Sequence, residues 1–218
     1  MFSEGWQEIL MLVCVWAVSY LAGTINPATM VGKARGIDIK HEGSGNPGTT
    51  NTLRVMGVKA AAIVLAVDVL KGVIMVLLWG AIFGETAAMA AAFGVLCGHC
   101  FPFNQGFDGG KGVATAFGAL TALEPALGLG CLGIVILAVL ITRRVSPGSI
   151  AGAISCPVLS IWLLPEFVPL ACVMAAIVIY RHKSNIIRLI NHEEPPFSFK
   201  RKKEEPEENE TDKEDGAR

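Results

Sequence analysis

The sequence predicts an all-α polytopic membrane protein, because apolar runs recur along nearly the whole chain and the charged residues between them are sorted by sign. The 218 residues are 52% hydrophobic, with a mean hydropathy of +0.53. Only 17% of them are charged, whereas a typical soluble domain has about 25%. A bundle of membrane-spanning helices therefore describes the composition better than one or two soluble domains of this length.

The apolar runs divide the chain into about seven candidate transmembrane helices. They lie at about residues 9–31, 59–80, 86–103, 112–123, 126–142, 149–164 and 167–180. Several are shorter than the roughly 20 residues that a perpendicular helix needs to cross a bilayer. Such runs fit half-helices, tilted pairs, or one long helix that only the pair Glu124-Pro125 divides. Residues 1–8 are acidic rather than basic, so we expect the first run to be a retained span and not a cleaved signal.

The sign of the charges predicts the orientation. With the N-terminus outside, the outer segments contain no Lys or Arg and carry only Glu4, Glu8, Glu85, Glu124 and Glu166. The inner segments hold the basic residues, and Lys71 is the only one within a span. An excess of Lys and Arg is typical of cytoplasmic loops. We therefore expect an outside N-terminus, a cytoplasmic C-terminus and cytoplasmic glycine-rich loops.

The first glycine-rich loop reads Gly43-Ser-Gly-Asn-Pro-Gly-Thr-Thr-Asn51 and is followed by Arg54. Glycine permits positive φ angles and close backbone approach, and the N–H groups of such loops bind anions. At an inner membrane face beside Arg54, this pattern predicts an anion-binding loop. The alternative is a flexible loop that caps the next helix through Asn46, Thr49 or Asn51.

The second glycine-rich loop reads Gly109-Gly-Lys-Gly-Val-Ala-Thr115. It resembles part of a P-loop but lacks the full pattern, because Gly112 follows the lysine and position 105 is Gln. A nucleotide triphosphatase is therefore disfavoured. Lys111 still lies where a helix is expected to begin, and a helix N-terminus favours an anion. The alternative, an ordinary cytoplasmic lysine, leaves the flanking glycines unexplained.

Cys97-Gly-His-Cys100 has the spacing of a disulfide oxidoreductase motif, but it ends an apolar run and does not lie in a thioredoxin-like βαβ unit. Zinc needs further ligands, and none has recognisable spacing. We therefore regard the cysteines as coincidental and His99 as the residue of interest.

Asp68 and Lys71 lie on one face of the second span, three residues apart. Charges inside a span usually face each other or a cavity. We expect an internal ion pair that shapes the site, with direct substrate contact as the alternative.

The last span ends in Tyr180-Arg-His-Lys-Ser-Asn185. Topology explains the cations but not His182 or Asn185, which are therefore site candidates. We divide the chain into an integral membrane domain, residues 1–192, and a disordered charged cytoplasmic tail, residues 193–218, which has too little apolar surface to fold. Lys200–Lys203 are expected to solubilise this tail, or to touch anionic lipid headgroups.

Taken together, four ordered motifs resemble a known family. They are Gly43–Asn51, Asp68-Val-Leu-Lys-Gly72, Gly98-His-Cys-Phe-Pro102 with Gly109–Thr115, and Tyr180–Asn185. With them, the sequence resembles the bacterial acyl-phosphate:glycerol-3-phosphate acyltransferases, the PlsY family, over about residues 10–192. It departs from the usual family pattern at Gly23-Thr-Ile-Asn-Pro27, Thr49 and Cys100.

The resemblance implies a seven-span enzyme of the bacterial cell (inner) membrane. It would transfer a fatty acyl group from acyl phosphate to the 1-hydroxyl of sn-glycerol 3-phosphate, giving lysophosphatidic acid and phosphate. The implied partners are glycerol 3-phosphate, acyl phosphate and membrane lipid. No nucleic acid, cofactor or metal is expected, and neither acyl-CoA nor acyl carrier protein would be the donor.

The resemblance also supplies site residues. Polar residues that line the family's substrate site match Ser44, Arg54, Lys111, Ser149 and Asn185, and a nearby one matches His182. We expect catalytic roles for Ser44, Lys111, Asn185 and His182. We expect substrate-binding roles for Gly43, Gly45, Asn46, Asn51, Arg54, His99, Gly109, Gly110, Gly112 and Ser149.

Acyl phosphate is already activated, so the reaction requires no nucleophilic side chain. We expect a substrate phosphate to accept the hydroxyl proton, with His99 and His182 as rival bases. Two other classes remain open. An organic-phosphate transporter also uses broken helices that point at anions, although the chain lacks a repeat and places every motif on one face. A membrane redox protein rests on Cys97 and Cys100 alone.

Overall fold

The computed structural model describes residues 4–197 and shows helices as their only regular secondary structure, which confirms the all-α class. Residues 1–3 and most of the expected tail, including Lys200–Lys203, lie outside the described residues. The α-helices are α1 (Glu4–Gly23), α2 (Pro27–Ala34), α3 (Thr49–Met56), α4 (Val58–Phe83), α5 (Glu85–Cys100), α6 (Val113–Leu123), α7 (Pro125–Thr142), α8 (Val145–Leu163), α9 (Val168–Arg181) and α10 (Lys183–Ile190). Short 3₁₀ helices form at η1 (Phe103–Gln105) and η2 (Pro165–Phe167).

The chain is a multi-pass membrane protein. Within residues 4–197, five helical segments are long and apolar enough to cross a membrane, and a pair bent by 58°, Pro165–Arg181 with Lys183–Ile190, raises this number to six. The one remaining expected span, at residues 112–123, corresponds to α6, which has only 11 residues. The count of seven and the orientation therefore stay predictions.

Two breaks between helices have clear local causes. Glu124 separates α6 from α7, where its carboxylate accepts a hydrogen bond from the N–H of Ala126 at 3.0 Å and Pro125 begins the helix. This excludes one long helix through residues 112–142. The expected span at 9–31 falls within the candidate span Gly5–Ala34, but its helix breaks between α1 and α2, because Asn26 caps α2 by accepting from the N–H of Thr29 at 3.0 Å.

Close helix packing depends on glycine. The helices α1 and α4 both pack against α5, and α7 and α9 both pack against α8. A Cβ at Gly98 would meet the carbonyl of Tyr20, and one at Gly72 would meet the carbonyl of Thr115. Small residues let membrane helices approach in this way. Large apolar side chains such as Ile141 (74% exposed) and Trp162 (72% exposed) stay on the outside of the bundle, as expected of a surface that faces lipid.

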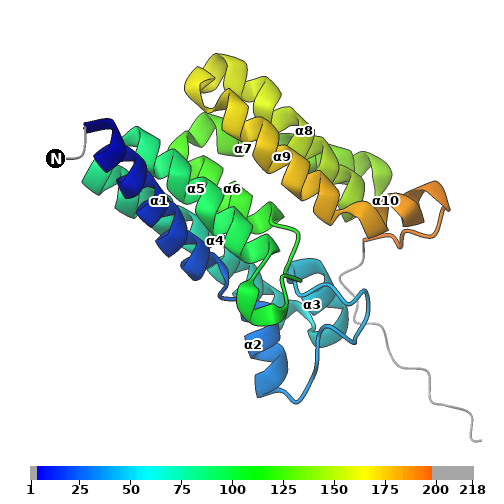
Figure 1. Cartoon of the computed structure of the whole chain (residues 1–218). Coiled ribbons are helices and arrows are strands. Elements are labelled where there is room, and N and C mark those ends of the chain that lie inside the picture. The colour runs from blue at the N-terminus through cyan, green and yellow to red at the C-terminus, as the bar shows by residue number, and fades with distance from the viewer. Residues whose placement is uncertain (1–3, 198–218) are drawn as a thin grey trace, which may run out of the picture.

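The short helices gather at one end of the bundle. Figure 1 shows α2, α3 and α10 at the end away from the N-terminus, together with the loop that connects α5 to α6. Both glycine-rich loops belong to this end. The fold thus brings the motifs of the sequence together at one face of the membrane-spanning bundle.

Candidate functional site

A cavity of about 250 Å³ opens among the first glycine-rich loop, α3, the start of α6, the start of α8 and the junction of α9 with α10. Most of the predicted site residues line it. These are Ser44, Asn46, Asn51, Arg54, His99, Lys111, Gly112, Ser149, His182 and Asn185. Gly43, Gly45, Gly109 and Gly110 are not among its lining residues.

Two helix N-termini reach this cavity. The helix α3 starts after Gly48 and α6 starts after Gly112, and neither glycine offers a capping side chain. The first N–H groups of an α-helix have no partner within the helix, and they carry the positive end of its dipole. Gly48, Thr49, Gly112 and Val113 all line the cavity. The arrangement suits two anionic groups.

Arg54 extends from α3 to the cavity and is only partly exposed. Within residues 4–197 it makes no hydrogen bond or ion pair. Loss of water around the guanidinium lowers the pKa of Arg54, and the charge of Glu194 opposes that effect. A guanidinium stays charged in proteins and can hold a phosphate through two parallel hydrogen bonds. Arg54 is therefore a cation without a hydrogen-bond acceptor at the cavity wall.

Lys111 is held by an amide. Its Nζ donates to Oδ1 of Asn185. Burial, aided by the charge of Arg188, lowers the pKa of Lys111 to about 8. The other end of the same amide donates to Ser146 Oγ and to Glu194 Oε1, both at 2.7 Å. The polar atoms of the Asn185 amide thus all have partners within the protein, and one of these partners is Lys111.

Glu194 is the residue that sequence reasoning missed. It was assigned to the disordered tail, yet the structure buries it at 4% exposure and bonds it to Ser146, Asn185 and Arg188. These hydrogen bonds lower the pKa of Glu194 against the opposing effect of burial. Arg144 donates to its backbone carbonyl at 2.7 Å. The carboxylate thereby fixes α10 against α8. It also accepts a hydrogen bond from Asn185, the partner of Lys111.

The first loop is shaped by Asn51. Its Oδ1 accepts from the N–H of Ser44 at 2.8 Å, and its Nδ2 donates to the carbonyls of Glu42 at 2.9 Å and Ile39 at 3.3 Å. Gly43 and Gly45 have positive φ angles, and a Cβ at Gly43 would meet the Asn51 amide. These glycines serve the path of the loop, and their expected contact with substrate stays a prediction.

The second loop is held by the end of α5. The N–H of Gly109 donates to Cys100 O at 3.2 Å, and the N–H of Gly110 donates to His99 O at 3.1 Å. Helix carbonyls therefore already accept from these two N–H groups, and a substrate-binding role of Gly109 and Gly110 stays a prediction. The N–H groups at the start of α6 remain for an anion. Arg181, expected only as a flanking cation, donates from Nε to the carbonyl of Gly110 at 3.1 Å and pairs with Asp108 at 2.9 Å.

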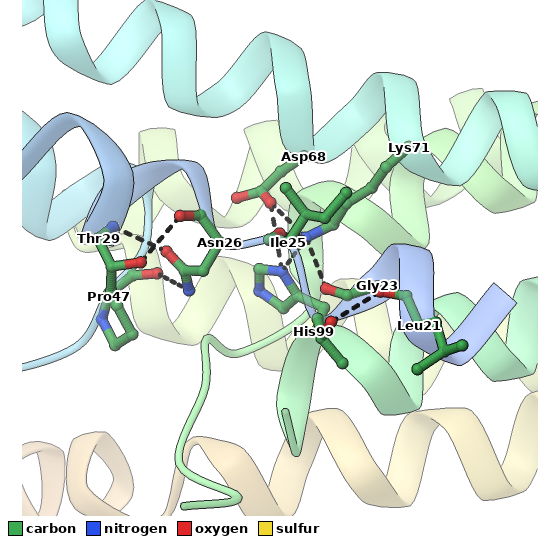
Figure 2. A network of polar contacts seen from close by, with 10 residues as sticks. Leu21, Gly23, Ile25, Asn26, Thr29, Pro47, Asp68, Lys71 and His99 are labelled. Atoms are coloured by element: carbon green, nitrogen blue, oxygen red, sulfur yellow. Dashed lines mark hydrogen bonds and ion pairs between the residues drawn. The ribbon is translucent and has the colours of Figure 1, made fainter. Parts of the chain in front are cut away.

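The predicted Asp68–Lys71 ion pair is present, with 2.7 Å between Oδ1 and Nζ. Figure 2 shows that His99 joins this pair, since its Nδ1 lies 2.8 Å from Lys71 Nζ and 3.3 Å from Asp68 Oδ1. Asn26 links the neighbouring helix break to the first loop by donating to Pro47 O at 3.1 Å. Asp68 and His99 both line the cavity.

The remaining candidates lie at the wall opposite α3. Nδ1 of His182 lies 2.7 Å from the carbonyl of Val178. A carbonyl only accepts, so Nδ1 carries a hydrogen and Nε2 keeps its lone pair in the neutral ring. Ser149 donates to Val145 O at 3.1 Å. It also lines a second, apolar cavity of about 80 Å³, which shares Val113, Phe117 and Leu132 with the first.

Fold and site together define a polytopic membrane protein with a cavity that is lined by two cations and two helix N-termini and that adjoins an apolar cavity. Residues 13–192 match the family described as glycerol-3-phosphate acyltransferase, and the chain belongs to that family. The protein of that name from Thermoanaerobacter sp. (strain X514) is 44% identical over 176 residues, which cover 79% of this chain and 89% of the relative. The one from Clostridioides difficile (strain 630) is 39% identical, over 89% of this chain and all of the relative.

Two solved structures share the fold. Both are crystal structures of PlsY (YgiH), an integral membrane glycerol 3-phosphate acyltransferase. The glycerol 3-phosphate form has a TM-score of 0.81 and 34% identity, and the match covers 86% of this chain and 96% of that one. The lysophosphatidic acid form has a TM-score of 0.79 and 33% identity, with the same coverage.

Proposed function

We propose that this chain transfers a fatty acyl group from acyl phosphate to the 1-hydroxyl of sn-glycerol 3-phosphate, at the inner membrane of a bacterial cell. The observation that carries the proposal is the convergence of two helix N-termini and two cations, Arg54 and Lys111, on one cavity. Each of the two substrates brings one phosphate. The names of the relatives, and the substrate and product forms of the solved structures, support the same reaction.

The neighbouring apolar cavity supports an acyl substrate. It meets the polar cavity at Val113, Phe117, Leu132 and Ser149. A fatty chain can lie against these apolar side chains while its phosphate faces the cations. We propose that Ser149, at this junction, lies beside the acyl carbonyl, and that Ser44 faces a phosphate from the first loop.

The reaction needs no group beyond the substrates and the protein. The 1-hydroxyl oxygen attacks the acyl carbonyl carbon and forms the ester bond, and the bond from that carbon to the phosphate oxygen breaks. Phosphate leaves with the electron pair. A substrate phosphate accepts the hydroxyl proton, as a group with a second pKa of about 6 can do. Arg54, Lys111 and the helix N-termini stabilise the negative charge.

The direct test uses purified full-length protein with palmitoyl phosphate and glycerol 3-phosphate. We expect release of phosphate and formation of lysophosphatidic acid, and no reaction with palmitoyl-CoA. Uptake of glycerol 3-phosphate into vesicles without phosphate release would instead favour a transporter. The double variant Cys97→Ser, Cys100→Ser should keep full acyl transfer. Loss of transfer in a folded variant would instead favour a membrane redox protein.

Variants of the two cations test the site. Lys111→Ala and Arg54→Ala should each lower kcat/KM by about 10²- to 10³-fold, as expected for removal of one preorganised donor. Lys59→Ala is the matched control, because Lys59 is exposed and does not line the cavity.

The substrate-assisted proton transfer has its own test. His182→Ala should keep measurable turnover, whereas a loss of about 10⁴-fold would make this histidine the base.

A further inference from the structure

The cluster of Asp68, Lys71 and His99 belongs to two helices, α4 and α5. The sequence predicted an ion pair for Asp68 and Lys71 and substrate binding for His99, but not how the three side chains act together. All three side chains are buried, with exposures of 2%, 8% and 5%. Figure 2 shows them meeting beside the break between α1 and α2. The cluster also touches the cavity, which Asp68 and His99 line. Its hydrogens can be assigned from the contacts of Lys71.

Lys71 has three hydrogen-bond acceptors. Its Nζ lies 2.9 Å from the carbonyl of Ile25, 3.2 Å from that of Gly23 and 2.8 Å from Nδ1 of His99. An ammonium group has three hydrogens and no lone pair. The carbonyls of Gly23 and Ile25 lie at and just after the end of α1, where the last carbonyls of a helix lack partners within it. The third hydrogen is therefore directed at His99 Nδ1.

Asp68 supplies the opposite charge. Its Oδ1 forms the ion pair with Lys71 at 2.7 Å but lacks hydrogen-bond geometry to any described residue. Its distance of 3.3 Å to His99 Nδ1 is long beside the 2.7–2.9 Å typical of a charged hydrogen bond. Asp68 thus keeps Lys71 charged, and Lys71 reaches the imidazole with the shorter contact.

These contacts determine the hydrogen on the ring. A hydrogen on Nδ1 would point at an ammonium group that cannot accept it. Nδ1 is therefore an acceptor, and a neutral imidazole then carries its hydrogen on Nε2. This Nε2 lies beside the Cα of Gly110, where a Cβ would meet it. Within residues 4–197 Nε2 makes no hydrogen bond.

We propose that His99 is a neutral imidazole that donates its Nε2–H to a phosphate oxygen in the cavity, and that Asp68 and Lys71 are positioning residues that fix this tautomer. The inference rests on the proposed function, since either substrate offers such an oxygen. His99 then binds substrate and is not a base, because the ring nitrogen that faces the cavity already carries a hydrogen. His182 has the opposite arrangement, with Nδ1 donating and Nε2 unprotonated.

The first test reads the tautomer directly. Full-length protein labelled with ¹⁵N-histidine contains four histidines, and the His99 signals are those lost in His99→Gln. We expect an unprotonated Nδ1 and a protonated Nε2, with the Nε2–H signal shifting when inorganic phosphate or glycerol 3-phosphate is added. A hydrogen on Nδ1, or an imidazolium, would overturn the proposal. Absence of acyl transfer in the wild type would refute the proposed function but would not change the measured tautomer of His99.

The second test separates the two ring nitrogens. The Gln amide can place an N–H near the position of Nε2, whereas the Asn amide reaches only the position of Nδ1. His99→Gln should keep kcat/KM within about fivefold of the wild type, and His99→Asn should lower it about 10- to 100-fold, mainly through KM. Equal losses in two equally stable variants would contradict a role for Nε2–H.

The third test addresses the positioning residues. In Lys71→Met the hydrogen should move to Nδ1, where Asp68 can accept it, and the signals of His99 should show the change. KM for at least one phosphate substrate should rise about tenfold, as expected for one lost hydrogen bond to a charged group. An unchanged tautomer in a folded Lys71→Met protein would show that Lys71 only supports the helix break.

Discussion

In the first glycine-rich loop, one side chain of the following helix makes three hydrogen bonds to the backbone, whereas the second loop is bonded to the preceding helix and to an arginine of α9. Asn51 alone contacts Ser44, Glu42 and Ile39. In the second loop, backbone N–H groups donate to the last carbonyls of α5, and a backbone carbonyl accepts from Arg181 of α9. The shape of the first loop therefore depends mainly on contacts within residues 39–51, whereas the shape of the second depends on how α5 and α9 pack. Each ends at a helix N-terminus in the same cavity.

The largest effect is expected where one side chain makes three contacts. Asn51→Ala leaves the N–H of Ser44 and the carbonyls of Glu42 and Ile39 without the amide that now pairs with them. Ser44 and Glu42 are exposed, so water can replace the amide there, but Ile39 is buried. One unpaired buried group costs about 1–3 kcal/mol, so activity should fall by up to about 100-fold. Phosphate release and thermal unfolding in detergent measure the result. Asn104→Ala removes an exposed amide and should change neither, and if both variants behave alike, Asn51 does not hold the loop.

In the second loop, we expect activity to fall when a side chain is added where there is no room for it, even though no hydrogen bond is removed. A Cβ in Gly110→Ala would meet the ring of His99, which the ion pair keeps from moving. Overpacking costs about 1–3 kcal/mol, which corresponds to about a 10- to 100-fold loss of activity. Gly133→Ala is the matched control, because a Cβ there meets no atom within 4 Å. Full activity of Gly110→Ala would show that the approach of His99 to the loop is not needed.

Sequence patterns predicted the fold class and ten of the residues that line the cavity, because apolar runs, charge sign and glycine-rich motifs are local signals. The break before α2 had such a signal as well, since Asn26 and Pro27 are typical of a helix start. The span predicted at 9–31 did not include this break.

Glu194 had no such signal. It lies in a charged, proline-containing segment, and its burial follows from groups on α8 and α10 that only the fold brings together. For the same reason, the sequence did not predict the partners of the N–H groups of Gly109 and Gly110. A glycine-rich sequence indicates accessible N–H groups, but it does not indicate that the end of α5 accepts hydrogen bonds from them.

A smaller effect should follow from loosening the second loop at α9. Arg181→Lys keeps the charge but cannot reach Asp108 and the carbonyl of Gly110 together. We expect about a tenfold loss in kcat/KM, as for one charge-assisted hydrogen bond. Arg143→Lys changes an arginine outside the cavity and should have no effect. The same loss in both variants would mean that Arg181 acts through charge alone.

The smallest effect is a pH dependence that distinguishes the two cations of the cavity, Lys111 and Arg54. Burial lowers the pKa of Lys111 to about 8, so its charged, anion-binding form predominates below that pH and disappears above it. Because kcat/KM reports the free enzyme, its value should fall up to about tenfold per pH unit above pH 8. Arg54 stays charged throughout this range and cannot cause the fall. Lys111→Arg should therefore abolish it, and a decline that persists in this variant would assign the titration to another group.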